Sequence, residues 1–261
     1  MNKYLLYRIT SKVNQKPRIN GFSKLDCLDS LLHAFPDYKV ICIADNCDTF
    51  TYDLLKKQPF HKLVETNLGN AASFRHLINQ ELDLLQDDDL VYFAEDDYLY
   101  RGRADQILEE GLQYFDYATL YDHPDKYGTN PLELNLLVPK GKLSEYTQII
   151  KGKMSLWRTT NSTTMTFGCF VSTIRKDILL WNLFTRGFKV PRDFYTWILL
   201  TCPTKNFFRP KRNLSIVILM SLLLHVLRGR RTLGVPFPSV SAHLEVGMVP
   251  DNFESSFPRK I

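Results

Sequence analysis

The fold is decided by Leu90-Val91-Tyr92-Phe93-Ala94-Glu95-Asp96-Asp97, an apolar run that leads directly into three carboxylates. A continuous apolar run of this length is typical of a strand that is buried on both faces, as in a parallel sheet. Three adjacent carboxylates repel one another and need cations or hydrogen-bond donors to balance them. Ligands of open α/β sheets bind beyond the carboxyl ends of the strands, so the triplet is a candidate site for a divalent cation that carries a diphosphate. The alternative is an acidic surface turn, which is how we interpret Asp87-Asp88-Asp89 just upstream.

Strand and helix patterns alternate before this motif. We expect strands at residues 4–9, 38–44, 62–66 and 90–94, and helices at 22–35 (with Ser23 as the N-cap), 51–57 and 71–85. Strands that alternate with helices indicate right-handed βαβ units. The sequence therefore predicts an α/β fold with a mostly parallel sheet flanked by helices.

The second half of the chain is less regular. We expect helices at 103–115, 174–186 and 193–201, and strands at 117–121 and 163–173. From about Pro203 onward no strand pattern is clear, which predicts a helical C-terminal extension. The apolar stretch 214–227 is shorter than the roughly 20 residues of a membrane span. We expect it to be a buried helix, and the alternative is an interfacial helix, because basic residues flank it.

Composition places the chain among ordinary globular proteins, with 44% hydrophobic and 23% charged residues. The net charge is +5, and its excess is concentrated in Lys205, Arg209, Lys211, Arg212, Arg228, Arg230 and Arg231. Such a cluster attracts nucleic acid, anionic lipid or the phosphates of a small substrate, or it forms a solvated rim. We expect no nucleic-acid partner and keep 205–231 as a candidate for peripheral membrane contact. Five scattered cysteines without a CxxC pair predict reduced thiols in the cytoplasm.

Polar residues also follow the other expected strands. Asp45 follows the second strand, where a carboxylate can accept hydrogen bonds from a nucleobase or ribose, or can simply form an Asx turn. Small residues from Gly69 follow the third strand and let the backbone approach a ligand. Arg75 lies on the helix that opens there, where it could meet a base or a phosphate.

Together these features resemble the GT-A fold glycosyltransferases, particularly the family 2-like group, over roughly residues 3–125. In that group an acidic residue after the second strand and an arginine in the following helix hold the nucleotide, and a DxD-like motif holds ribose and metal. The resemblance implies that Asp45 and Arg75 contact the base, Asp96 the ribose, and Asp97 the metal, Mn²⁺ or Mg²⁺. Thr10, at the end of the first strand, would line the nucleotide pocket.

The sequence departs from the group's pattern at two motifs. The second-strand motif reads ADNCD rather than DDGSTD, so Asp45 and Asp48 compete for one role. The acidic motif reads EDD rather than DDD or DAD, so Glu95 could share metal or ribose binding.

The resemblance also implies a catalytic base. The group usually carries a later acidic motif whose aspartate deprotonates the acceptor hydroxyl, and the match here is Asp193, with Arg192 where Glu is common. Its carboxylate would take the proton as the hydroxyl attacks the anomeric carbon opposite the diphosphate, with inversion. Asp193 could instead cap its helix. His123 is then the alternative base.

A histidine near the C-terminus is a further metal ligand in many GT-A enzymes, and His243 fits that description. The alternative is an ordinary surface or core histidine. Two polar-aromatic stretches, 122–127 and 157–164, have the hydroxyls and rings that could bind an acceptor sugar, or they are an ordinary loop and strand.

The resemblance therefore implies one glycosyltransferase domain over residues 1–261, with a nucleotide-binding half (about 1–125) and an acceptor-binding half with the C-terminal extension (about 126–261). It would move a sugar from a nucleotide-diphosphate donor to a glycan or another hydroxyl acceptor. One alternative is a nucleotide-sugar pyrophosphorylase, although residues 10–18 lack the glycines of its usual basic loop. Another is a non-catalytic basic module that binds nucleic acid or membrane, which leaves the strand-end carboxylates unexplained.

Overall fold

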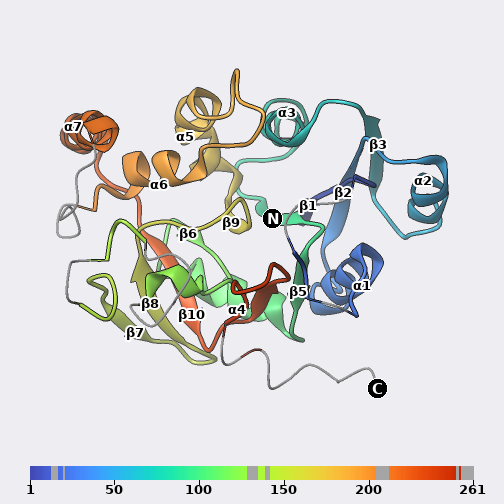
Figure 1. The fold of residues 1–261 in the computed structure, drawn as a ribbon, viewed down its shortest axis with the longest axis horizontal. Coiled ribbons are helices and arrows are strands. Elements are labelled where there is room, and N and C mark those ends of the chain that lie inside the picture. The colour runs from blue at the N-terminus through green and yellow to red at the C-terminus, as the bar shows by residue number, and fades with distance from the viewer. Residues whose placement is uncertain are drawn as a thin grey trace.

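The computed structural model describes residues 1–12, 17–19, 21–127, 135–138, 142–203, 212–250 and 253, and for residues 212–215 only the backbone. A nine-stranded sheet runs through the molecule, with helices on both faces (Figure 1). Its strands, in order across the sheet, are β3 (Lys62–Thr66), β2 (Lys39–Asp45), β1 (Lys3–Ile9), β4 (Leu90–Glu95), β9 (Phe167–Phe170), β6 (Tyr117–Ala118), β10 (Leu233–Phe237), β8 (Leu156–Thr160) and β7 (Ile149–Lys151).

The sheet is parallel at one end and mixed at the other. Strands β1 to β4 pair in parallel. Strand β9 is antiparallel to both β4 and β6, and β8 is antiparallel to both β10 and β7, while β6 and β10 pair in parallel. All strands except β8 and β9 therefore run in one direction, which confirms the predicted α/β class with a mostly parallel sheet.

The helices are α1 (Lys24–Ala34), α2 (Thr49–Leu55), α3 (Asn70–His76), α4 (Ala104–Gly111), α5 (Val171–Leu183), α6 (Asp193–Thr201) and α7 (Arg212–Arg228). A π-helical turn η1 (Leu77–Glu81) and two 3₁₀ turns, η2 (Leu82–Leu84) and η3 (Pro124–Lys126), complete them. A second, two-stranded sheet pairs β5 (Tyr98–Tyr100) with β11 (Ser241–His243).

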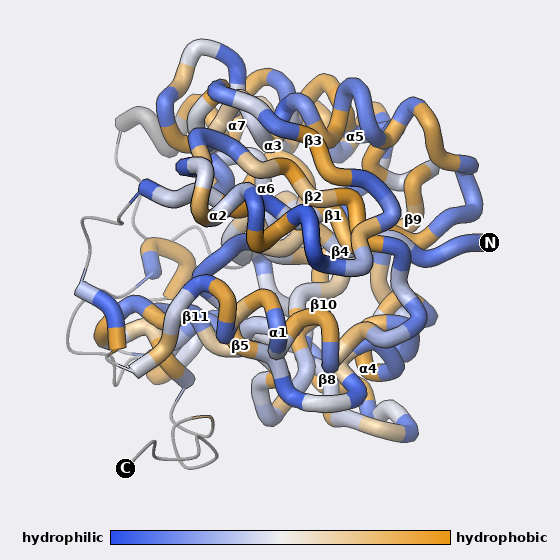
Figure 2. The backbone as a smooth tube through the Cα atoms, turned by 90° about the vertical axis from the view of Figure 1, so that its right-hand side faces the viewer, coloured by the Kyte–Doolittle hydropathy of each residue, from blue (hydrophilic) through white to orange (hydrophobic). Residues whose placement is uncertain are grey.

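Two hydrophobic cores cover the two faces of the sheet. Successive side chains of a strand point to opposite faces. Leu5 of β1 accordingly packs in one core with α1 and α4, and Leu6 packs in the other with α3, α5 and α6. Hydrophobic colour follows β1 and β2 between these layers in Figure 2. The buried strands hold their carboxyl ends, and the polar residues there, in fixed positions.

Helix α1 begins at the predicted cap. The Oγ of Ser23 accepts a hydrogen bond from the backbone N of Asp26 (3.1 Å), and the carboxylate of Asp26 accepts one from the backbone N of Ser23 (2.7 Å). This reciprocal pair is a capping box, which satisfies two backbone donors at the helix start.

Several expectations for the second half were wrong. The strand expected at 163–173 is confined to β9, because its last residues already belong to α5. The C-terminal part is not free of strands, since β10 joins the main sheet and β11 the small one. Pro236 lies in β10, and β8 pairs with β10 on one side at this position. On the other side, β6 pairs with β10 only at Leu233 and Gly234 and so ends before Pro236. The missing N–H of this proline therefore faces no partner strand.

Helix α7 is not the buried helix that the sequence predicted. Val217 and Ser221 face inward, but Val226 and Leu227 are 84% and 80% exposed. No helix in the described part of the chain has the length and apolar character that crossing a bilayer requires. Residues 204–211, which precede α7 and carry part of the predicted basic cluster, lie outside the described residues.

Candidate active site

A cleft of about 260 Å³ opens at the carboxyl ends of β1, β2 and β4 and the start of α3. It lies at the sheet edge where the strand pattern predicted a ligand. Five of the predicted nucleotide- or metal-binding residues line it: Thr10, Asp45, Glu95, Asp96 and Asp97.

Each carboxylate of the triplet has a protein cation beside it. Glu95 is 2.7 Å from Arg8, and Asp96 is 2.6 Å from Lys24. The backbone N of Thr10 also donates to Asp96 (3.0 Å), so Thr10 contributes its main chain. These partners offset the repulsion between adjacent carboxylates.

Asp97 lies 3.4 Å from the guanidinium of Arg18 and 3.2 Å from the Nε2 of His243. Leu244 N donates to Asp97 O (2.9 Å), which fixes the backbone around the pair. The small sheet makes this contact possible, because His243 of β11 is paired in register with Tyr98 of β5 and its ring stacks on that tyrosine at 4.8 Å.

Electrostatics separate the three acids. Burial raises the pKa of Glu95 to about 7 although Arg8 opposes the shift. Burial, with the charge of Asp97, also raises the pKa of Asp96. Burial works in the same direction on Asp97, but the hydrogen bond and charge of His243 outweigh it and leave the pKa of Asp97 below its ordinary value. Asp97 is thus the member of the triplet that stays an anion most readily.

Asp97 and His243 provide an oxygen and an imidazole nitrogen, ligands that Mn²⁺ accepts. Among the described residues no group of three or more His, Cys, Asp or Glu side chains is arranged to hold a metal ion. A divalent ion here would therefore take its remaining ligands from a bound diphosphate and water, as Mg²⁺ commonly does with substrate phosphates. The residues fit a site that is completed by its ligand.

Asp45 reaches the cleft but its carboxylate is already engaged. Its two oxygens accept hydrogen bonds from the hydroxyl of Thr66 (2.9 Å) and from two backbone N atoms, those of Leu68 (2.6 Å) and Gly69 (2.9 Å). Asn46 Nδ2 donates as well, at 2.8 Å. This geometry favours the turn-forming alternative for Asp45, which holds the loop between β3 and α3.

Asp48 does not share the place of Asp45. It caps α2, where its carboxylate accepts a hydrogen bond from the backbone N of Thr51 at 2.7 Å. Asn46, between the two acids, takes a left-handed φ of 54° and its Oδ1 accepts a hydrogen bond from Lys12 (2.9 Å) at the cleft.

Two arginines line the cleft, Arg8 and Arg18, whereas Arg75 is not part of the lining. Arg8 donates to the backbone O of Asn70 (2.7 Å) and to its side-chain Oδ1 (2.8 Å), in addition to its ion pair with Glu95. Arg8, Lys12, Arg18 and Lys24 also line the cleft, although none of them was among the predicted site residues. The signal for Arg8 was a charged residue near the end of an otherwise apolar strand.

Asp193 lies outside the cleft lining, at the start of α6. The N-cap of α6 is Arg192, so Asp193 is not the N-cap, although its Oδ1 accepts a hydrogen bond from the backbone N of Phe194 (2.8 Å). Burial raises the pKa of Asp193 to about 6, against the hydrogen bond from Phe194 and the charge of His123. A carboxylate with this pKa is ionised at neutral pH and basic enough to accept a proton.

A chain of aromatic contacts connects the two groups of residues. His123 lies against Tyr121 with ring centroids 5.1 Å apart, and Tyr121 meets both Tyr98 (5.3 Å) and His243 (6.3 Å). The histidine whose charge acts on Asp193 is therefore two ring contacts from the histidine that binds Asp97.

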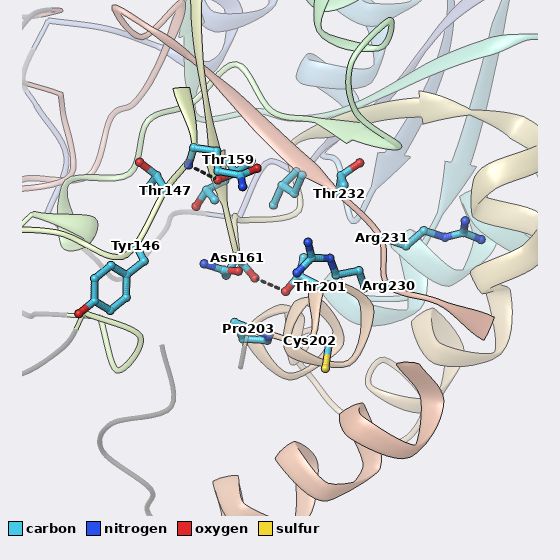
Figure 3. A pocket seen from close by; sticks show the side chains of 13 residues that line it. Tyr146, Thr147, Thr159, Asn161, Thr201, Cys202, Pro203, Arg230, Arg231 and Thr232 are labelled. Carbon is cyan, nitrogen blue, oxygen red and sulfur yellow. Dashed lines mark hydrogen bonds between the residues drawn. The ribbon is translucent and has the colours of Figure 1, made fainter. Parts of the chain in front are cut away.

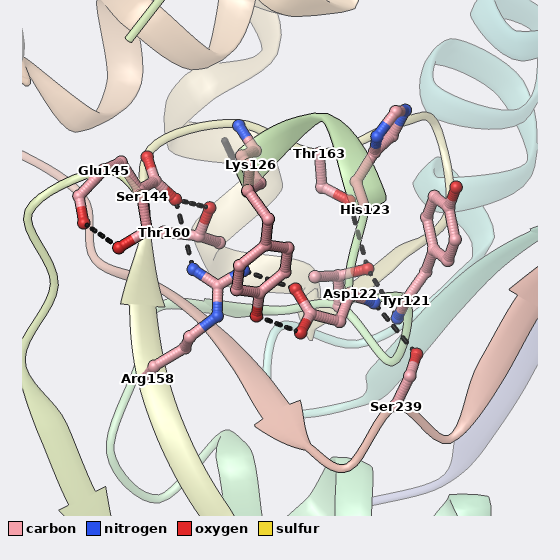
Figure 4. Close-up of polar contacts among 12 residues, drawn as sticks. Tyr121, Asp122, His123, Lys126, Ser144, Glu145, Arg158, Thr160, Thr163 and Ser239 are labelled. Atoms are coloured by element: carbon pink, nitrogen blue, oxygen red, sulfur yellow. Dashed lines mark hydrogen bonds and ion pairs between the residues drawn. The ribbon is translucent and has the colours of Figure 1, made fainter. Parts of the chain in front are cut away.

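The two expected acceptor stretches meet, but largely inside the protein (Figure 4). Asp122 accepts hydrogen bonds from Arg158 and from the hydroxyl of Tyr127 (2.6 Å), and Arg158 also lies 3.3 Å from Glu145. Asp122, Glu145 and Arg158 are buried. His123 points away from this network in Figure 4.

A second cavity of about 250 Å³ lies at the opposite edge of the sheet (Figure 3). It is lined by the end of β8, the end of α6 and the start of β10. Thr201 closes one side by donating to the backbone O of Asn161 (3.0 Å). None of the predicted catalytic, nucleotide-binding or metal-binding residues belongs to its lining, but Thr159, Thr160 and Asn161 of the expected acceptor stretch 157–164 do.

Comparison with known proteins concerns the fold. No protein-family model matches the sequence, and no curated protein matches it. Similar solved structures include Staphylococcus aureus TarS residues 1–349, with a TM-score of 0.44, 14% identity, and coverage of 87% of this chain and 72% of that chain. The galactosyltransferase LgtC, in complex with donor and acceptor sugar analogs, has a TM-score of 0.40, 8% identity, and coverage of 92% and 86%.

A structure of a different activity is similar to the same extent. The 4-diphosphocytidyl-2C-methyl-D-erythritol synthase from Anaerococcus prevotii has a TM-score of 0.43, 12% identity, and coverage of 85% of this chain and 96% of that chain. The similar structures thus include both sugar transferases and a synthase, and a likeness at these identities and TM-scores assigns no function.

Proposed function

We propose that the chain is a glycosyltransferase that uses a nucleotide-diphosphate sugar as donor. The observation that carries the proposal is the contact between Asp97 and His243, two residues from distant parts of the sequence, beside a cleft at the carboxyl edge of the parallel strands. The cleft also holds several cationic side chains, so it offers partners for phosphates as well as for a metal ion and ribose hydroxyls.

Asp97 and His243 would hold the divalent ion, Mn²⁺ or Mg²⁺. When bound, the ion neutralises charge on the diphosphate leaving group. Arg18 and Lys24, which now pair with Asp97 and Asp96, supply further positive charge for the phosphates. Asp96 and Glu95 are the acids in reach of the ribose.

Asp193 is the proposed base. Its carboxylate takes the proton of the acceptor hydroxyl while the acceptor oxygen bonds to the anomeric carbon and the bond from that carbon to the diphosphate breaks. The displacement inverts the anomeric configuration. The displaced pKa of Asp193 supports this role, since a base works best when its pKa lies near the operating pH.

One observation favours a second candidate, a nucleotide-sugar pyrophosphorylase. Lys12, Arg18 and Lys24 bring basic side chains to the end of β1, where such enzymes bind a nucleoside triphosphate. That enzyme would join the nucleotide to a sugar phosphate and release pyrophosphate, and it would have no use for a carboxylate base on α6.

Thermal melting with a panel of nucleotide-diphosphate sugars, with and without Mn²⁺, tests the proposal. A ligand that binds only the folded protein stabilises it by about 2.7 kcal/mol at 100 times its Kd. We expect a stabilisation that requires Mn²⁺, that is lost in Asp97→Asn and His243→Ala, and that persists in the control Asp87→Asn, a carboxylate whose side chain is 71% exposed.

Product analysis separates the two candidates. Slow, Mn²⁺-dependent release of free nucleoside diphosphate from the donor supports the glycosyltransferase. Release of pyrophosphate from a nucleoside triphosphate and a sugar phosphate supports the pyrophosphorylase. An equal stabilisation of the wild type and of Asp97→Asn would contradict the proposal that Asp97 holds the metal ion of the bound donor.

A further inference from the structure

Helix α7 presents an apolar surface to solvent. Its inward face packs on α6, where Val217 is buried and the hydroxyl of Ser221 donates to the backbone O of Ile198 (2.8 Å). The opposite face exposes seven large apolar side chains: Ile216, Leu219, Met220, Leu222, Leu223, Val226 and Leu227. Soluble monomers rarely expose so many adjoining apolar side chains, and such patches mark interaction surfaces.

In the sequence, the segment that contains α7 carries charged residues of one sign only. Residues 205–231 contain seven Lys and Arg and no Asp or Glu, a net charge of +7. The remaining chain has 33 − 7 = 26 basic and 28 acidic residues, a net charge of −2. The positive net charge of the protein therefore resides in this segment, and Arg228 and Arg230 at the end of α7 are exposed.

Arg228 and Arg231 also hold the helix end on the body of the protein. Arg228 lies 2.7 Å and Arg231 2.8 Å from the buried carboxylate of Asp177 on α5. These ion pairs with Asp177 hold the C-terminal end of α7 in place, so its apolar face has a fixed position on the protein.

We propose that this face of α7 docks on the surface of an anionic lipid bilayer. A helix of 17 residues is about 25 Å long, and α7 does not meet the requirements for crossing a membrane, so it would lie along the surface. Apolar side chains then enter the boundary between headgroups and acyl chains, while flanking arginines meet anionic headgroups.

A second copy of the chain is the other obvious occupant, and charge argues against it. In a two-fold dimer the same surface faces itself. Basic residues stand at both ends of α7, Arg212 first and Arg228 last. Each copy carries the segment 205–231 with its net charge of +7, so a dimer through α7 brings two segments of like charge together, whereas an anionic bilayer offers the opposite charge.

Flotation of the full-length protein with vesicles tests the proposal. One set is pure phosphatidylcholine and the other contains about a third phosphatidylglycerol. We expect binding to the anionic vesicles. Because salt screens the attraction between basic side chains and anionic headgroups, 0.5 M NaCl should weaken this binding about tenfold or more. The double variant Val226→Glu/Leu227→Glu should lower the partition coefficient at least tenfold, because it places two carboxylates in the apolar face.

The matched control is Phe50→Glu, an apolar side chain on α2 that is 74% exposed, at the opposite end of the molecule in Figure 1. It should bind vesicles like the wild type. The single variant Leu219→Glu provides a second test should the double variant fail to fold, which its melting temperature reveals. The assay needs no nucleotide, so it fails or succeeds independently of the proposed sugar transfer.

Three outcomes would overturn the proposal. The first is no binding to either vesicle, and the second is equal binding to neutral and anionic vesicles. The third is a dimer, by light scattering, that Val226→Glu/Leu227→Glu converts to monomer while vesicles capture neither form. That last result would assign the face to a second copy.

Discussion

Two groups of charged side chains lie in this molecule, and they are built differently. At the donor cleft, Glu95, Asp96 and Asp97 each meet a cation at the lining of an open space. In the network of Asp122, Glu145 and Arg158, the side chains of the three residues are only 4%, 0% and 10% exposed.

Glu145 has the largest number of partners in this network. Glu145 accepts hydrogen bonds from the hydroxyl of Thr160 (2.5 Å) and from Asn161 (2.9 Å), besides its contact with Arg158. Charges that are sealed and fully hydrogen-bonded hold structure, whereas ion pairs that face a cleft can exchange a partner for a ligand. The comparison favours a structural role for the network and a binding role for the cleft, and Asp193, the proposed base, belongs to neither group.

The sharpest test of this division is Asp193→Asn. We expect kcat/KM to fall by roughly 10²–10⁴-fold, the usual contribution of a general base. Because burial raises the pKa of Asp193, its charged form is disfavoured in the folded state, so the variant should melt no lower than wild type at pH 7. A large loss of both activity and stability would show that Asp193 belongs to the structural group.

Arg158→Ala should have the opposite effect. It leaves the buried carboxylates of Asp122 and Glu145 without their cation, which typically costs about 3–5 kcal/mol. Urea unfolding at pH 7 measures the loss. Lys56→Ala removes an exposed pair with Asp53 and is the control, expected to change stability by less than about 1 kcal/mol. An equal loss in the free energy of unfolding for the two variants would contradict the structural role of the Asp122, Glu145 and Arg158 network.

The two arginines near α3 test the boundary of the donor cleft. Arg8→Ala should weaken binding of a nucleotide-diphosphate sugar roughly 10- to 100-fold, about the 1.5–3 kcal/mol of a hydrogen bond to a charged group. Arg75→Ala should leave it unchanged, because Arg75 is not in the cleft lining. Isothermal titration with Mn²⁺ present compares them, and a loss confined to Arg75→Ala would return the base-binding role to that residue.

The smallest effect is that of mild acid. With a pKa of about 6, Asp193 becomes protonated as the pH falls through 6, so kcat should drop about tenfold from its plateau by pH 5. The pH profile of kcat at saturating donor and acceptor measures this drop. An acid limb near pH 4 would mean that the base is an ordinary exposed carboxyl.

The donor side could be predicted because its signals are local. Apolar runs indicated β1, β2 and β4, and Ser23 marked the start of α1. The acids after β4 lie where a strand end must place them. The basic partners were missed because ion pairing depends on the folded chain: Arg18 reaches Asp97 across 79 residues.

The second half was harder because its strands are short and their pairing is non-local. Strand β6 has two residues, and β10 contains a proline that sequence patterns read as a break. The sequence also did not show which face of α7 is exposed. A helix that is apolar on all sides has the same sequence pattern whether the rest of the protein covers it or not. The expectation that His243 and Asp97 share a metal site came from the family resemblance. The pairing of β5 with β11 is what brings the two side chains together.

The pairing of β11 has a consequence for how the protein comes to be active. Residues 17–19 bridge to residues 244–246, through Ile19 N to Leu244 O at 2.9 Å and Val246 N to Pro17 O at 3.0 Å, so one wall of the donor cleft joins early and late parts of the chain. A polypeptide that has been synthesised only as far as β10 still lacks β11, so it cannot place His243 beside Asp97. The contact between these two residues therefore forms only after more than 240 residues have left the ribosome.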